Sequence, residues 1–288
     1  MEWLDVLVQG ALTGGLYALF ATGLSLIFGV MRLVNLAHGD LIVLAAYFAL
    51  ACVQHLGLPP LATIAVVVPA MAAFGYGLQR LLLNRTLGGD ILPPLLVTFG
   101  LSIVIQNALL EAFSADSRKL ALGGLETASL QVTPDLAVGW YPLLVLIAAG
   151  VVIGGLQLLL YRTQLGAALR ATSDDPVTVR LMGVDNRHLF AVAMAAALAV
   201  SGIAGVLMAG WTNFDPLSGP QRLLYAFEAV IIGGLGSLWG TLAGGLILGT
   251  AQSVGAAINP GWQVLAGHLA FLAVLLLAPR GLFPRTAA

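Results

Sequence analysis

Long apolar runs separated by short polar segments occupy almost the whole chain. Each run is long enough, or nearly so, to cross the hydrocarbon core of a bilayer as a helix of roughly 20 residues. The pattern predicts an all-α polytopic membrane protein with a single transmembrane domain over residues 1–288 and eight or nine spans, one or two of them short or broken. The expected spans are Val6–Val30, Leu41–Val53, Leu61–Leu83, Ile91–Phe113, Tyr141–Leu160, Leu189–Gly210, Leu223–Leu235, Leu246–Ile258 and Val264–Leu277.

The polar segment Arg162–Arg187 interrupts this pattern with the marks of ordered structure. Asp175 is a good N-cap, because its carboxylate can accept bonds from the free N–H groups of a first turn. Pro176 suits the first helical position, and Gly183 suits the left-handed position that follows a helix. These residues predict a short helix from Pro176 to Met182.

This short helix has one apolar face. Val177 and Leu181 are four residues apart and share that face, with Met182 beside them. A second helical piece is expected from Gln164 to Thr172. Two short helices between membrane spans form a surface to which a partner protein can bind. An ordinary capped connector between spans explains the same local signals.

Composition supports the membrane interpretation. Hydrophobic residues make up 59% of the chain and charged residues only 9%, with a mean hydropathy of +0.98, whereas soluble proteins carry roughly 25% charged residues. The net charge of −1 provides no basic patch, so nucleic-acid binding is not expected. The single cysteine, Cys52, excludes an internal disulfide.

The cations are distributed unevenly between the two sides that the spans define. Arg118, Lys119 and Arg222 fall on one side. The larger group on the opposite side consists of Arg32, Arg80, Arg85, Arg162, Arg170, Arg180, Arg187, Arg280 and Arg285. Because short cytoplasmic loops are enriched in Arg and Lys, we expect the 162–187 segment and the C-terminus, Ala288, in the cytoplasm and the N-terminus, Met1, outside.

Glycines indicate close helix packing and a helix break. The pairs Gly150 and Gly154, Gly240 and Gly244, and Gly245 and Gly249 have the four-residue spacing that lets helices approach closely. We expect these pairs to pack within the chain. The glycine-rich run from Gly233 to Gly240 predicts a break between two short membrane elements, a feature common in transport pathways.

Catalytic and metal motifs are not found in the sequence. The only lysine, Lys119, does not follow a glycine-rich loop, so the P-loop of an ATPase is excluded. The four histidines form no HExxH motif, and no serine occupies a G-x-S-x-G elbow. We therefore expect no catalytic residues and no metal site in this chain.

Polar groups inside membrane spans are costly, which makes them candidates for a transport pathway. In MRLVNLAHGD, Asn35 is expected to cap a helix that begins at Leu36, so that a carboxylate can approach the free N–H groups beside it. A cytoplasmic turn, or for the later residues hydrogen-bonded packing, explains the same features. The candidate pathway residues are Asn35, His38, Gly39, Asp40, Gln106, Asn107 and Glu228.

Several motifs together resemble the permease subunit of branched-chain amino-acid ABC importers. These are GLSLIFGVMRLVNLAHGDLIVLAAY from Gly23, LGAALRATSDDPVTVRLMGV from Leu165, IIGGLGSLWGTLAGGLILG from Ile231 and the tail APRGLF from Ala278. The resemblance covers nearly the whole chain. One departure is PRG in the tail, where the family often has PQG.

The resemblance implies an ABC importer permease fold in a bacterial inner membrane and a pathway for Leu, Ile or Val. It also implies a homologous second permease, two cytoplasmic ATPases that bind the ATP and Mg, a periplasmic or lipid-anchored binding protein, and contact with membrane lipid. No cofactor is expected on this chain. The residues matching the ATPase-coupling segment are Gly166, Arg170, Ala171, Asp175, Pro176, Val177, Leu181, Met182 and Gly183.

Other functions remain open from the sequence. Related permeases serve urea, amides or other amino acids, and selectivity rests largely in the binding protein. A stand-alone channel or secondary transporter fits the composition equally well, but it leaves the ordered polar segment without a purpose. A membrane enzyme fits less well, because no catalytic motif is present.

Overall fold

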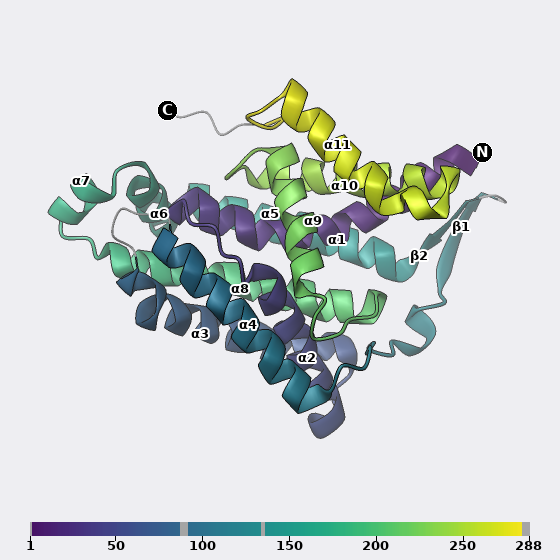
Figure 1. Ribbon diagram of the computed structural model, residues 1–288, viewed down its shortest axis with the longest axis horizontal. Helices are drawn as coiled ribbons and strands as arrows, with labels where there is room; N and C mark the ends of the chain where they lie inside the picture. Colours follow the sequence, from purple (N-terminus) through teal and green to yellow (C-terminus); the bar gives the residue numbers. More distant parts are fainter. Residues whose placement is uncertain (1, 87–91, 134–135, 284–288) are drawn as a thin grey trace.

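The computed structural model describes residues 2–86, 92–133 and 136–283 as a bundle of helices (Figure 1). Four residues that the sequence analysis singled out, Met1, Ile91, Arg285 and Ala288, lie outside these ranges. The helices are α1 (Glu2–Met31), α2 (His38–Leu56), α3 (Ile64–Leu81), α4 (Leu92–Phe113), α5 (Trp140–Arg162), α6 (Gln164–Asp174), α7 (Pro176–Leu181), α8 (Asn186–Trp211), α9 (Gly219–Gly233), α10 (Leu238–Ile258) and α11 (Gln263–Leu277).

Within the described residues, eight helices are long and apolar enough to cross a membrane. The seventh apolar run, Leu223–Leu235, forms α9, whose 15 residues extend only about 22 Å at 1.5 Å per residue, short of a hydrocarbon core of about 30 Å. The prediction of eight or nine spans with a short element is confirmed. The second run, which is short in the sequence, is lengthened to 19 residues because α2 extends from His38 to Leu56.

Glycines allow α1 and α10 to pack with their backbones in contact, and this is the most extensive contact between helices. A Cβ atom at Gly249 would lie 2.4 Å from the carbonyl oxygen of Gly10, and one at Gly245 would lie 2.7 Å from that of Gly14. Gly240 and its partner Gly244 similarly face the backbone of α9. The packing expected of these two pairs is confirmed.

The pair on α5 behaves differently. A Cβ atom at Gly150 or Gly154 would meet no described atom within 4 Å. The expectation that this pair packs within the chain is therefore wrong for the described residues. The four-residue spacing indicates only that a helix face lacks side chains, and it does not determine which segment packs on that face.

This difference gives a stability test. Gly249→Val should destabilise the protein by about 1–3 kcal/mol or more, because the added side chain must separate α1 from α10. Gly150→Val, which meets open space, is the matched control and should stay close to wild type. Thermal unfolding of the purified protein in detergent measures both variants. Equal unfolding temperatures for the two would contradict the packing described.

The glycine-rich run forms the expected break between α9 and α10. Gly234 has φ +106° and Gly236 φ +79°, a region that side chains disfavour. Ser237 then caps α10 by accepting a bond from the N–H of Gly240 at 3.2 Å. The C-terminal motif packs onto the break, since a Cβ atom at Gly281 would lie 2.4 Å from the Cα of Gly234.

The two ends of the bundle differ in structure. At one end, which we call the α7 end, Asn84 in the turn after α3 donates a hydrogen bond to the carbonyl oxygen of Arg187 at the start of α8. At the other, the hairpin end, strands β1 (Ser129–Thr133) and β2 (Leu136–Gly139) pair antiparallel, and Gln9 of α1 donates to a β2 carbonyl at 2.9 Å. The sequence analysis missed this hairpin, which is too short to show a clear alternation of apolar and polar positions. Figure 1 shows α7 and the hairpin at opposite ends.

Candidate functional site

The segment between α5 and α8 folds back against the end of α5. Thr163 caps α6, because its hydroxyl oxygen accepts a bond from the N–H of Gly166 at 3.0 Å. A Cβ atom at Gly166 would lie 2.2 Å from the carbonyl oxygen of Leu159. Glycine is thus required where α6 crosses the last turn of α5, which fixes the direction in which the segment leaves the bundle.

The short helix α7 is built on the capping residues that the sequence indicates. The Asp175 carboxylate accepts bonds from the N–H groups of Val177 and Thr178, each at 3.0 Å, and from the Thr178 hydroxyl. The Thr178 hydroxyl and N–H groups lower the pKa of Asp175, so the cap is ionised at neutral pH. Gly183 follows the helix with φ +84°. The predicted helix is confirmed, ending one residue early, at Leu181, with Met182 as C-cap.

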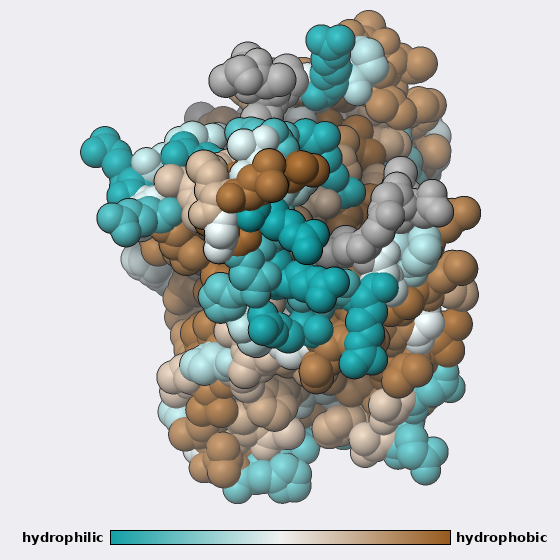
Figure 2. Space-filling view, turned by 90° about the vertical axis from the view of Figure 1, so that its left-hand side faces the viewer, coloured by the Kyte–Doolittle hydropathy of each residue, from teal (hydrophilic) through white to brown (hydrophobic). Residues whose placement is uncertain are grey.

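An apolar face of α7 points away from the protein. The exposed fractions of Val177, Leu181 and Met182 are 69%, 83% and 69%, whereas Val179 on the opposite face is buried. The helix is held in place because the Asn186 amide donates to the Pro176 carbonyl oxygen at 2.6 Å. Figure 2 looks onto this end, where hydrophilic residues surround a few hydrophobic ones. The arrangement is an exposed apolar surface, which we call the α7 face (Val177, Leu181 and Met182).

The other residues of the expected coupling segment lie nearer to the bundle. The Arg170 guanidinium lies 4.5 Å from the centre of the Tyr161 ring and faces a cavity, while Ala171 is exposed beside it. The Ser173 hydroxyl, which the sequence analysis did not single out, donates to the carbonyl oxygen of Gly29 at 2.6 Å. This bond links α6 to the last turns of α1.

The segment before α2 is a turn buried in the protein. The side-chain carbonyl oxygen of Asn35 accepts a hydrogen bond from the N–H of Ala37 at 3.0 Å. The expectation that Asn35 caps a helix beginning at Leu36 is wrong, because Leu36 and Ala37 form a turn and the helix begins at His38. The bond from the Leu36 N–H to the Thr98 hydroxyl, at 3.2 Å, holds this turn against α4.

Two polar atoms, one in this turn and one in the first residue of α2, have no hydrogen-bond partner among the described residues. They are Nδ2 of Asn35 and Nδ1 of His38, both in fully buried side chains. Nε2 of His38 lies 2.8 Å from the carbonyl oxygen of Phe20. Since a carbonyl oxygen can only accept, Nε2 carries the hydrogen and Nδ1 presents a lone pair. The turn therefore offers one free donor and one free acceptor.

Asp40 joins α2 to α4. Its carboxylate accepts a bond from the Ser102 hydroxyl at 2.6 Å and from the Gln106 amide at 3.0 Å. The sequence analysis did not identify Ser102. Its position four residues before Gln106, which places both side chains on one helix face, was the available signal. Gly39 beside Asp40 is a packing position, because a Cβ atom there would lie 2.0 Å from the carbonyl oxygen of Gly219.

The remaining candidate pathway residues lie in separate places. Asn107 is exposed on α4 and donates to the Ile103 carbonyl oxygen of its own helix. Glu228 is buried in α9 and pairs with His268 of α11. The structure thus groups Asn35, His38, Gly39 and Asp40 near the start of α2, brings Gln106 to Asp40, and leaves Asn107 and Glu228 outside that group.

The apolar helices and the buried polar turn define a multi-pass α-helical membrane protein. A family model described as the permease component of branched-chain amino acid transport systems matches residues 6–278. The chain belongs to this family, which confirms the resemblance seen in its motifs.

Full-length relatives carry the same description. The chain is 30% identical to the high-affinity branched-chain amino acid transport system permease protein BraD of Pseudomonas aeruginosa, over 99% of this chain and 96% of BraD. It is 26% identical to the Escherichia coli permease protein LivH, over 99% of this chain and 96% of LivH. It is also 27% identical to LivM of the same organism, over 94% of this chain and 68% of LivM.

Proposed function

We propose that this chain is the membrane-spanning subunit of an ATP-driven importer and forms a pathway for branched-chain amino acids. The family and the relatives, whose names state this transport, support the substrate class. The α7 face, an exposed apolar surface on a capped helix outside the spans, supports the proposal that a separate ATPase drives transport. A stand-alone transporter has no use for such a surface.

The proposed complex contains two homologous permeases, two ATPases and a substrate-binding protein outside the membrane. One organism contains both LivH and LivM, and this chain resembles both, which favours pairing with a second permease of the family. The ATPases hold ATP and Mg, and this chain contributes movement of its spans and no catalytic group.

Affinity purification of the tagged chain from its native membrane tests the assembly. We expect a P-loop ATPase to copurify. Uptake of labelled leucine by vesicles of the purified complex, with unlabelled isoleucine, urea or an amide as competitor, then tests the substrate. Competition by urea and none by isoleucine would assign the chain to another branch of the family.

The proposed orientation places the α7 end in the cytoplasm and the N-terminus outside, because the arginine-rich loops lie at the α7 end. In a background with Cys52→Ala, cysteines at two exposed positions, Gln164→Cys and Lys119→Cys, report the two ends. We expect a membrane-impermeant maleimide added to intact cells to label the position-119 variant and to label the position-164 variant only after permeabilisation. The reverse pattern would invert the topology.

For the pathway, we propose that the turn before α2 meets the substrate. A zwitterionic amino acid complements the two unpartnered atoms, because its carboxylate accepts from Asn35 Nδ2 and its ammonium donates to His38 Nδ1. Both side chains are buried, so the substrate reaches them only when the spans move apart. Asp40, through its bonds to Ser102 and Gln106, holds α4 beside this turn. The exposed amide of Asn107 and the buried carboxylate of Glu228 stay secondary candidates for the same route.

A further inference from the structure

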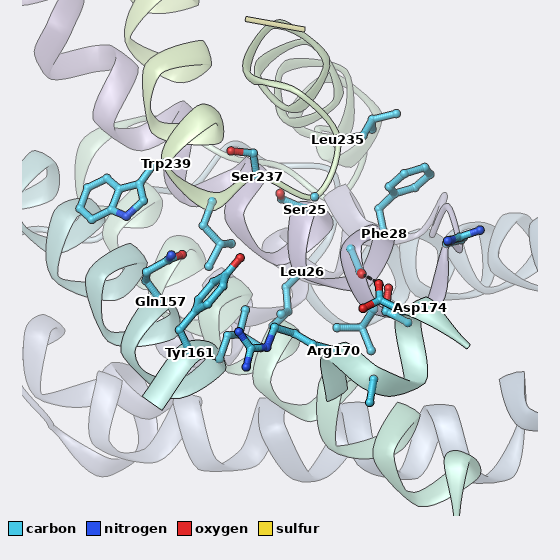
Figure 3. A pocket seen from close by; sticks show the side chains of 18 of the residues that line it. Ser25, Leu26, Phe28, Gln157, Tyr161, Arg170, Asp174, Leu235, Ser237 and Trp239 are labelled. Atoms are coloured by element: carbon cyan, nitrogen blue, oxygen red, sulfur yellow. Dashed lines mark hydrogen bonds between the residues drawn. The ribbon is translucent and has the colours of Figure 1, made fainter. Parts of the chain in front are cut away.

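A cavity of about 960 Å³ opens at the α7 end, and neither Asn35 nor His38 lines it. It lies between the last turns of α1 and α5, the helix α6 and the break between α9 and α10, as Figure 3 shows. These segments are far apart in the sequence. The cavity is distinct from the α7 face, whose residues do not line it.

Two arginines supply positive charge to the cavity. Arg170 is held over the Tyr161 ring, which orients its guanidinium. Arg32 follows the last residue of α1 with φ +52°, a backbone conformation that few residues other than glycine adopt. Neither arginine forms an ion pair within the described part of the chain. Asp174 is the acid among the described lining residues, and it has a partner.

Two serine hydroxyl groups also line the cavity. Ser25 of α1 is buried, and its hydroxyl oxygen has no hydrogen-bond partner among the described residues. Ser237, at the start of α10, lies across from it in Figure 3. An unpaired buried hydroxyl is costly, so its presence in a cavity that two arginines also line indicates a ligand with acceptor oxygens.

The cavity lies at the ends of membrane spans. Its walls include the final turns of α1 and α5, and the ends of spans are expected near the lipid headgroups. Trp239 and Leu235 line the cavity and are 51% and 42% exposed. On α5, Leu158 next to the lining residue Gln157 is also exposed. Aromatic residues beside arginines at this depth are typical of lipid-binding positions.

We propose that this cavity binds the headgroup of an anionic phospholipid from the leaflet at the α7 end. The phosphate accepts bonds from Arg170, Arg32 and Ser25, and the glycerol backbone and upper acyl chains lie along Leu26, Leu238 and the exposed side of Trp239. A free phosphate ion shares the headgroup chemistry but leaves the apolar walls and most of the volume unfilled. The lipid is therefore the better fit, and it would brace α6 against α1 and α5.

Lipid retention by the purified full-length protein tests the proposal. The protein is incubated in nanodiscs of phosphatidylcholine and phosphatidylglycerol, transferred to detergent, and analysed for bound lipid by mass spectrometry. We expect wild type to retain phosphatidylglycerol. Arg170→Gln and Arg32→Gln should each retain about fivefold less, the usual effect of removing one interfacial arginine.

Matched variants distinguish lipid binding in this cavity from nonspecific attraction between arginines and anionic lipid. Arg162→Gln removes an exposed arginine of the same region that does not line the cavity, and it should retain lipid like wild type. Ser25→Ala changes no charge and should lower lipid retention. Arg170→Lys keeps the positive charge and should retain more lipid than Arg170→Gln. If Arg170→Gln fails to insert, Arg32→Gln and Ser25→Ala test the same site.

Two results would overturn the proposal. One is equal retention of phosphatidylglycerol by wild type, Arg32→Gln and Ser25→Ala. The other is thermal stabilisation by inorganic phosphate, in phosphatidylcholine alone, as large as that given by phosphatidylglycerol, which would identify a site for free anions. Because retention is measured without the ATPases or any transport, it is independent of the proposed importer function.

Discussion

Leu181→Asp is expected to abolish the stimulation of ATP hydrolysis by substrate in the reconstituted importer, while the chain still inserts in the membrane. Leu181 is 83% exposed and lies in the middle of the α7 face, so it contributes little to packing within its own chain. A carboxylate buried in an apolar contact with the ATPase should weaken that contact by at least about 2 kcal/mol, or roughly 30-fold in affinity. Hydrolysis and uptake by vesicles containing the complete complex measure the loss.

Two further variants identify the cause of this loss. Leu181→Met keeps an apolar side chain of similar volume and should couple nearly normally. Gly183→Val leaves the α7 face unchanged but strains the left-handed position after the helix by roughly 1–2 kcal/mol, which should misplace the whole face. Substrate-stimulated hydrolysis at the wild-type level in both Leu181→Asp and Gly183→Val would mean that the 162–187 segment is a passive connector.

Asn35→Ser and Asn35→Leu are expected to reduce uptake at low substrate concentration. A serine hydroxyl can still accept the bond from the Ala37 N–H, so Asn35→Ser keeps the turn and removes only the unpartnered Nδ2 donor. Losing one hydrogen bond to a charged substrate group should weaken the interaction by about 1.5–3 kcal/mol. Asn35→Leu loses the turn as well and should be worse. The dependence of uptake rate on leucine concentration measures both.

Asn84 provides the control for this experiment. Its side chain is also buried, but both of its polar atoms have partners, since it accepts from Gln79 and donates to the Arg187 carbonyl oxygen. Asn84→Ser should therefore lower thermal stability and leave the KM for leucine unchanged. A wild-type KM for Asn35→Ser would remove Asn35 from the pathway, whatever Asn35→Leu does.

Features set by neighbouring residues could be predicted from the sequence. The capping of α7 depends on Asp175, Pro176 and Gly183, which lie within nine positions of one another, and the structure has each in its expected role. The break after α9 was equally local, because the glycines that permit its backbone angles are consecutive or nearly so. The spans could be predicted too, because each one is a continuous run of apolar residues.

Features set by distant residues could not be predicted in this way. The turn before α2 is bonded to Thr98, which belongs to another helix, and the position of Gly39 is explained only by the backbone of α9. The missing contacts of Gly150 illustrate the same limit. The bond from Ser102 to Asp40 and the cavity at the α7 end also unite segments that no local pattern connects.

The contact between α1 and α10 has a consequence for biosynthesis. α1 has its most extensive contact with α10, which ends at Ile258 and is therefore synthesised much later than α1. At about 5–20 residues per second, α1 waits on the order of 10–45 s for that partner. Until then, the smooth surface at Gly10 and Gly14 faces lipid or the insertion machinery. A chain that stops before α10 therefore carries an uncovered first helix, which membrane quality control can recognise and degrade.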